Sequence, residues 1–151
     1  MSDFPSKARV VVIGGGVVGA SCLYHLALKG WTDCVLLEKN ELTAGSTWHA
    51  AGNVPTFSTS WAIMNMQRYS TELYAGLAEK VDYPMNYHQS GSIRLAHTKE
   101  RMQEFERAMS MGRYQGIAME MWTPEEAKER YPFLETHDLA GVLWDPSDGD
   151  I

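Results

Sequence analysis

The hydrophobic pattern of the first forty residues predicts a strand, a helix and a second strand. Ala8 to Ile13 is a largely β-branched run without alternation, which is typical of a parallel strand buried on both faces. Val17 to Leu28 is predicted to be a helix that ends at Lys29-Gly30, a cationic last turn followed by a glycine cap. Cys34 to Leu37 is a second buried strand, so the three segments form a βαβ unit.

The rest of the chain is predicted to contain amphipathic helices and short strands. Apolar residues at steps of three and four, from Ala62 to Leu77, favour a helix over residues 60–80. Gly91 to Ala96 alternates, which is typical of a strand with Ile93 and Leu95 on one face. The further predicted elements are a helix from Thr98, a strand at Ala118–Trp122, a helix after the capping-box sequence Thr123-Pro124-Glu125-Glu126, and a strand at Leu139–Trp144.

Composition and charge exclude several classes of protein. The chain has 151 residues, of which 44% are hydrophobic, and a formal net charge of −6, so it has no basic surface for nucleic acid. Its apolar runs are far shorter than the roughly 18 residues of a membrane span. Two cysteines and the absence of a signal or transit peptide predict a reducing, cytoplasmic location of bacterial type.

A glycine-rich turn lies between the first strand and the first helix. Gly14, Gly16 and Gly19 fit the pattern G-x-G-x-x-G. In this pattern the first glycine makes the tight turn, the second lets the backbone approach a pyrophosphate, and the third lets helix and strand pack closely. The backbone N–H groups of Val17 and Val18 would then face the phosphates from the positive end of the helix.

An acidic residue completes this dinucleotide-binding pattern. Glu38 follows the second strand, 19 residues after Gly19. A carboxylate at this position accepts hydrogen bonds from ribose hydroxyls and would repel a 2′-phosphate. The pattern therefore predicts an adenine dinucleotide, and it leaves NAD and FAD open.

The segment after Glu38 is small and rich in hydroxyl groups, where an NAD-binding fold would continue into an ordinary crossover helix. Such residues let a backbone run close to a ligand, and a short helix starting near Ser46 would offer its amides to a pyrophosphate. We expect this segment to contact the cofactor through Lys39, Gly45, Ser46, Thr47, Trp48, His49, Ala50, Ala51, Gly52 and Asn53.

The stretch Val10–Gly52 closely resembles the dimethylglycine and sarcosine dehydrogenases, flavoproteins of the D-amino-acid-oxidase-like superfamily. The resemblance continues through His88–Ala96, which is more similar to the dimethylglycine members, and through Asp148-Gly149. In this family the histidine of the sequence S-T-W-H-A-A-G, here His49, carries FAD covalently through the flavin 8α-methyl carbon. A neutral imidazole nitrogen is a suitable nucleophile near pH 7.

The resemblance implies an incomplete α/β fold. Residues 1–85 would be the first part of a Rossmann-like FAD-binding domain, and residues 86–147 the first part of a mixed-sheet, D-amino-acid-oxidase-like substrate domain. Residues 148–151 would begin the return to the FAD domain. Only two parallel strands are predicted, fewer than a nucleotide crevice needs, so we expect an N-terminal fragment of a longer protein.

The implied activity is oxidation of the N-methyl C–N bond of dimethylglycine or sarcosine by hydride transfer to FAD. The one-carbon unit would leave as formaldehyde or pass to tetrahydrofolate, bound by a further C-terminal domain. Catalytic residues are expected beyond residue 151, the electron acceptor is open, and no metal site is expected. Another FAD-dependent secondary-amine or amino-acid oxidase, an NAD-dependent dehydrogenase and an inactive fragment stay open as alternatives.

Arg94 has two interpretations. From its strand it could face a carboxylate substrate, or it could lie on a solvated face, which is the plainer reading of an arginine on an alternating strand.

Overall fold

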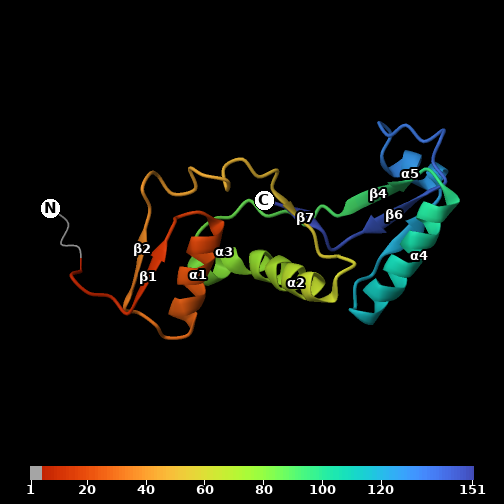
Figure 1. Ribbon diagram of the computed structural model, residues 1–151. Helices are drawn as coiled ribbons and strands as arrows, with labels where there is room; N and C mark the ends of the chain where they lie inside the picture. Colours follow the sequence, from red (N-terminus) through yellow and green to blue (C-terminus); the bar gives the residue numbers. More distant parts are fainter. Residues whose placement is uncertain (1–4) are drawn as a thin grey trace. The chain divides into compact units, whose positions relative to one another are not determined.

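The structure, a computed structural model, describes residues 5–151. Residues 1–4, part of the N-terminus in which we expect no leader peptide, lie outside this range. The chain forms two units, one that ends at Ala51 and one that spans Gly52–Ile151 (Figure 1). The domain boundaries given above stay a prediction.

The first unit is the predicted βαβ unit. Strands β1 (Val10–Ile13) and β2 (Cys34–Leu37) pair in parallel, and helix α1 (Val17–Leu28) packs on them. At the end of α1, Gly30 has φ +78°, and its N–H donates to the Ala27 carbonyl at 2.9 Å. This left-handed residue stops the helix at the predicted glycine.

The two parallel strands are not buried on both faces, contrary to the expectation from their composition. Val10 and Val12 are half-buried on one face, whereas Val11 is 50% and Ile13 86% exposed on the other. The reason is that the first unit supplies two strands and a single helix, which can cover only one face of the sheet.

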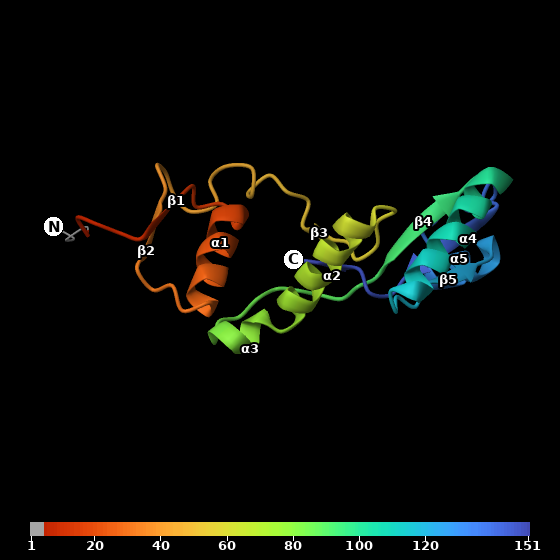
Figure 2. The ribbon, with the colours of Figure 1, turned by 60° about the horizontal axis from the view of Figure 1, so that its bottom comes forward.

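The second unit contains an antiparallel sheet with the order β4-β6-β5. Helix α4 lies beside this sheet (Figure 2). The central strand β6 pairs with β4 on one side and with β5 on the other. A separate pair of two-residue strands, β3 and β7, joins the start of the unit to its end. The elements of this unit are β3 (Asn53–Val54), α2 (Trp61–Ala75), α3 (Leu77–Val81), β4 (Ser92–Ala96), α4 (Lys99–Tyr114), β5 (Glu120–Trp122), α5 (Pro124–Arg130), β6 (Gly141–Asp145) and β7 (Gly149–Asp150).

The core of the second unit lies on both faces of this sheet. On one face Leu143 belongs to a buried cluster with α4 and α2, whose members are Phe57, Met64, Ala96, Phe105, Ala108, Ile117 and Met119. On the other face Val142 packs with Trp122, Ala127 and Leu139, next to α5. The sheet is therefore buried on both sides, as the short apolar strands require.

The long helix predicted over residues 60–80 is in fact two helices, α2 and α3, which meet at Gly76. The side that α2 turns to the core of the second unit carries Met64 and Thr71. Met66 and Tyr69, on the predicted apolar stripe, are 62% and 52% exposed. The capping box at Thr123 and the helix start at Thr98 are confirmed.

A buried carboxylate connects three parts of the second unit. Asp148, which is 4% exposed, accepts a hydrogen bond from the Thr56 N–H at 2.6 Å and one from the Ser92 hydroxyl at 2.5 Å. The Arg94 guanidinium lies 3.7 Å from the same carboxylate. The chain after β3, strand β4 and the turn before β7 are thus held by one side chain.

Within residues 5–151, no helix combines the length and the apolar character that a bilayer crossing would need.

The loop before β4 gives a test of how closely Trp144 of β6 packs against Gly91. Gly91 has φ +73°, and a Cβ there would lie 1.9 Å from the Trp144 ring; Gly116 has φ +76° with nothing within 4 Å of its Cβ position. Gly91→Ala should therefore lower the free energy of unfolding by about 1–3 kcal/mol more than Gly116→Ala, because only the first overpacks the core. Denaturant unfolding of the purified protein measures the difference. Equal losses would show that Trp144 does not close over Gly91.

Candidate functional site

The glycine-rich turn has the geometry that its first and third glycines predict. Gly14 has φ +108°, and its N–H donates to the Leu37 carbonyl of β2 at 2.8 Å. A Cβ at Gly19 would lie 1.9 Å from the Gly14 carbonyl oxygen. Both positions therefore need glycine for the backbone itself, one for its conformation and one for the close approach of α1 to the turn.

The N-terminus of α1 lies directly after this turn. Gly16 is the N-cap residue, with no side-chain cap of its own and no acidic residue in the first turn. The Val17 N–H donates instead to the Thr47 hydroxyl at 2.9 Å. A Cβ at Gly16 would meet the same hydroxyl oxygen at 2.9 Å, so Thr47 is itself one reason for glycine at this position.

The Glu38 carboxylate binds the turn from the end of β2. One of its oxygens accepts a hydrogen bond from the Gly15 N–H at 2.7 Å, and the other accepts one from the Asn40 N–H at 2.9 Å. These backbone donors, Gly15 first, hold the pKa of the Glu38 carboxyl below its ordinary value. The group is ionised at neutral pH, and each oxygen keeps a free lone pair for a further donor.

The segment expected to begin a short helix near Ser46 forms a series of turns instead. Residues 42–49 are turns throughout, and Thr43 has a left-handed φ of +67°. Serine, threonine and glycine are weak helix formers, and one helical turn gains too few hydrogen bonds to offset its nucleation cost. The segment contacts the glycine turn all the same, because the Thr43 N–H donates to the Gly15 carbonyl at 3.0 Å. No helix N-terminus is available here for a phosphate.

Two glycines of this segment differ in what surrounds them. Nothing lies within 4 Å of the Cβ position of Gly45, whose φ is not left-handed. Gly52 has φ +81°, and a Cβ there would lie 2.4 Å from the Ile151 carbonyl oxygen. Gly52 and Asn53 belong to the second unit, where β3 pairs with β7. The remaining predicted contact residues, Lys39, Ser46, Trp48, Ala50 and Ala51, are exposed.

The imidazole of His49 is exposed and held by one hydrogen bond. Its Nδ1 lies 3.0 Å from the Gly45 carbonyl oxygen. A carbonyl can only accept, so Nδ1 carries the proton in the neutral ring, and Nε2 is left with the free lone pair. Within residues 5–151, no group of three or more His, Cys, Asp or Glu side chains could hold a metal ion.

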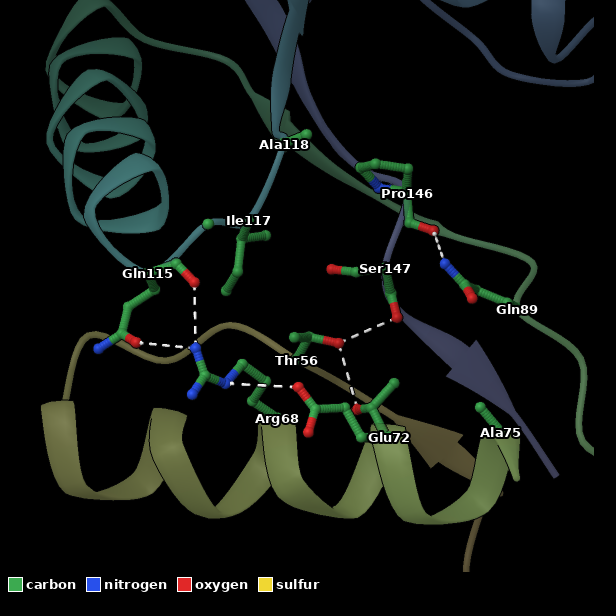
Figure 3. A pocket seen from close by; sticks show the side chains of 12 residues that line it. Thr56, Arg68, Glu72, Ala75, Gln89, Gln115, Ile117, Ala118, Pro146 and Ser147 are labelled. Carbon is green, nitrogen blue, oxygen red and sulfur yellow. Dashed lines mark hydrogen bonds and ion pairs between the residues drawn. The ribbon is translucent and has the colours of Figure 1, made fainter. Parts of the chain in front are cut away.

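The second unit has one cavity that the sequence did not indicate and another lined by Arg94, for which a carboxylate partner was considered above. The first, of about 390 Å³, lies between α2 and the segments around Ile117 and Ser147 (Figure 3). Its arginine, Arg68, donates to the backbone carbonyl and the side-chain oxygen of Gln115 and lies 3.7 Å from Glu72. The second, of about 380 Å³, is lined by Arg94 and by polar residues of β3, β4 and β7. The residues that line each cavity come from segments far apart in sequence, so hydrophobic periodicity could not reveal these cavities.

Comparison with known proteins agrees with the resemblance found in the sequence. The chain is 42% identical over 149 residues to a mitochondrial dimethylglycine dehydrogenase of Rattus norvegicus, covering 99% of this chain and 17% of that protein. It is 40% identical over 147 residues to a mitochondrial pyruvate dehydrogenase phosphatase regulatory subunit of Mus musculus, covering 97% and 17%. The chain thus spans about 17% of the length of these curated relatives.

Among solved structures, L-proline dehydrogenase from P. horikoshii matches with a TM-score of 0.87 and 30% identity, over 97% of this chain and 38% of that chain. The predicted fold class and the resemblance to the dimethylglycine and sarcosine dehydrogenases are confirmed. Residues 9–151 match the family described as FAD dependent oxidoreductase. This match favours FAD over NAD, and the chain belongs to the FAD dependent oxidoreductase family.

Proposed function

We propose that this chain supplies the nucleotide-binding start of an enzyme that oxidises the C–N bond of a small N-methylated amino acid. The observation that carries the proposal is the Glu38 carboxylate bonded to the Gly15 amide, next to the N-terminus of α1, where the N-cap residue Gly16 has no side chain to cap the helix. It supports the proposal because a dinucleotide needs an acceptor for its ribose hydroxyls and donors for its pyrophosphate at one strand end.

The residues of the first unit fit the adenosine and pyrophosphate part of FAD. The first N–H groups of α1 have no partner within the helix, and among residues 5–151 only the Val17 N–H is engaged, by the Thr47 hydroxyl. The open space at Gly45 permits a ligand to approach the backbone. The proposed contact residues of the first unit are Gly14, Gly16, Val17, Val18, Gly19, Glu38, Lys39, Gly45, Ser46, Thr47, Trp48, His49, Ala50 and Ala51. Gly52 and Asn53, which the sequence also suggests, belong to the second unit and stay a prediction.

His49 is the proposed point of covalent attachment. Its Nδ1–H is committed to the Gly45 carbonyl, so Nε2 is the nitrogen that is free to form a bond. The hydrogen bond also fixes the ring plane relative to the turn. Within the described chain this places an exposed nucleophilic nitrogen on the segment that covers the glycine turn.

The proposed substrate is dimethylglycine or sarcosine, in line with the name of the rat relative. A bound FAD would supply a hydride acceptor for the carbon next to the nitrogen, and water or tetrahydrofolate would capture the iminium that the substrate becomes. Tetrahydrofolate would need a domain beyond this chain, and the electron acceptor is open. A cytoplasmic location is likewise only proposed, and it differs from the mitochondrial location that the names of both curated relatives above give.

A second candidate function is regulation without amine oxidation. It is favoured by the mouse relative, which is named as the regulatory subunit of a phosphatase and is 40% identical to this chain. Retention of FAD without reduction of the flavin by any N-methylated amino acid would favour this candidate.

Gly45 tests the proposed cofactor path. Gly45→Ala should leave the melting temperature of the cofactor-free protein unchanged, because the added methyl group meets no protein atom. It should lower FAD loading, measured by the ratio of absorbance at about 450 nm to that at 280 nm, because the methyl group takes space needed by the ligand.

Gly16→Ala is the matched comparison, since its Cβ meets the Thr47 hydroxyl and should disturb both stability and loading. Full FAD loading of Gly45→Ala would show that the cofactor does not pass this residue.

His49 tests covalent attachment. After acid denaturation of the wild-type protein, yellow fluorescent flavin should migrate with the polypeptide in a denaturing gel. His49→Ala should release all its flavin, because the only proposed bonding nitrogen is lost. His137→Ala, which removes an exposed histidine of the second unit, should behave as the wild type. Complete release of flavin from the wild type would disprove the covalent bond and leave non-covalent FAD binding intact.

A further inference from the structure

The second unit contains an arginine whose donors are not used by the protein. We propose that the cavity of about 380 Å³ beside β4 binds a small zwitterionic amino acid, with its carboxylate on the Arg94 guanidinium. The cavity is lined by Asn53, Ser90, Ser92, Arg94, Asp148 and Asp150, among other residues. Arg94 is the only cationic side chain among its lining residues.

Arg94 does not lie on a solvated face. It points to the same side of β4 as Ala96, the side on which Leu143 and α4 form a core cluster. Its side chain is 29% exposed, and its guanidinium carbon lies 5.2 Å from the centre of the Phe57 ring. The cation–π contact and the neighbouring Asp148 hold the guanidinium in place without a hydrogen bond.

The donors of Arg94 are free for a ligand. The Asp148 oxygen nearest to it is 3.7 Å away, beyond hydrogen-bonding distance, and this carboxylate is already bonded to Thr56 and Ser92. Among the described residues no acceptor is hydrogen-bonded to the five N–H groups of Arg94. Arg68, in the other cavity, donates to two oxygens of Gln115, as Figure 3 shows.

The charges around the cavity complement a zwitterion better than a simple anion. The lining carries one cation, Arg94, and two carboxylates, Asp148 and Asp150, so a dianion or a bare carboxylate on Arg94 would leave the two acids without a partner of opposite charge. A ligand with one carboxylate and one ammonium group satisfies both signs, because the carboxylate pairs with the planar guanidinium and the ammonium faces the acids.

The inference rests on the proposed function only for the type of amine, an N-methylated amino acid. It predicts that the cavity prefers a ligand with a carboxylate, and this preference can be measured without any oxidation. Trimethylglycine and choline are suitable probes, because both carry the same quaternary nitrogen and differ only in a carboxylate or a hydroxymethyl group. Neither has a nitrogen lone pair to support oxidation.

Isothermal titration of the full-length holoprotein with each probe is the test. The wild type should bind trimethylglycine at least about tenfold more tightly than choline, as a charge-assisted pair requires. Arg94→Met should remove this preference, and Arg94→Lys should keep only part of it, because an ammonium group lacks the planar fork. Arg68→Met is the matched control and should bind as the wild type.

A thermal melt of each variant shows whether the second unit stays folded. If Arg94→Met does not fold, the wild-type preference and the Arg94→Lys titration decide whether Arg94 binds the carboxylate. Equal binding of both probes by the wild type, no binding of either, or an unchanged preference in a folded Arg94→Met protein would overturn the inference. A holoprotein that prefers trimethylglycine while dimethylglycine fails to reduce its flavin would disprove the proposed oxidation alone.

Discussion

The second unit depends on the burial of one negative charge, the carboxylate of Asp148. A buried carboxylate needs hydrogen-bond donors, and here each oxygen accepts one hydrogen bond, from the Thr56 N–H and from the Ser92 hydroxyl. These partners lie 92 and 56 residues away in sequence, so the charge forces three distant segments to meet. Loss of one of these donors typically costs about 1–3 kcal/mol, because it leaves a buried acceptor without its hydrogen bond.

The first unit also has a carboxylate that connects segments by accepting hydrogen bonds, but this carboxylate stays accessible. Glu38 also accepts backbone N–H groups, at Gly15 and Asn40, but it is only partly buried and each of its oxygens keeps a free lone pair. Asp148 is enclosed and engaged by protein donors, which makes it a structural group. Glu38 is accessible, which leaves it able to bind a ribose. Burial, rather than residue type, separates the two roles.

Local signals predicted most of the fold, and contacts distant in sequence account for what they missed. Helix α1, the strands β1 and β2 and the capping box at Thr123 follow from patterns within a few residues, and all were predicted. The two-residue strands β3 and β7 were not, because each is defined by its partner across the unit. The turn structure after Gly45 also depends on a distant contact, that of Thr47 with the α1 N-terminus. For the candidate site, the glycines and Glu38 could be found by spacing, whereas the hydrogen bonds of Thr47 and His49 required the structure.

The hydrogen bonds that Asp148 accepts explain why it makes no hydrogen bond to Arg94. A carboxylate that accepts a backbone N–H at 2.6 Å and a hydroxyl at 2.5 Å is fixed by the main chain and cannot turn toward a third donor. The guanidinium therefore stays at 3.7 Å, close enough for attraction and too far for a hydrogen bond. The Phe57 ring contacts the same guanidinium, its centre 5.2 Å from the guanidinium carbon, and takes none of the N–H donors as a hydrogen-bond acceptor would. The packing that stabilises the unit thus also keeps a planar, charged donor group ready for a carboxylate.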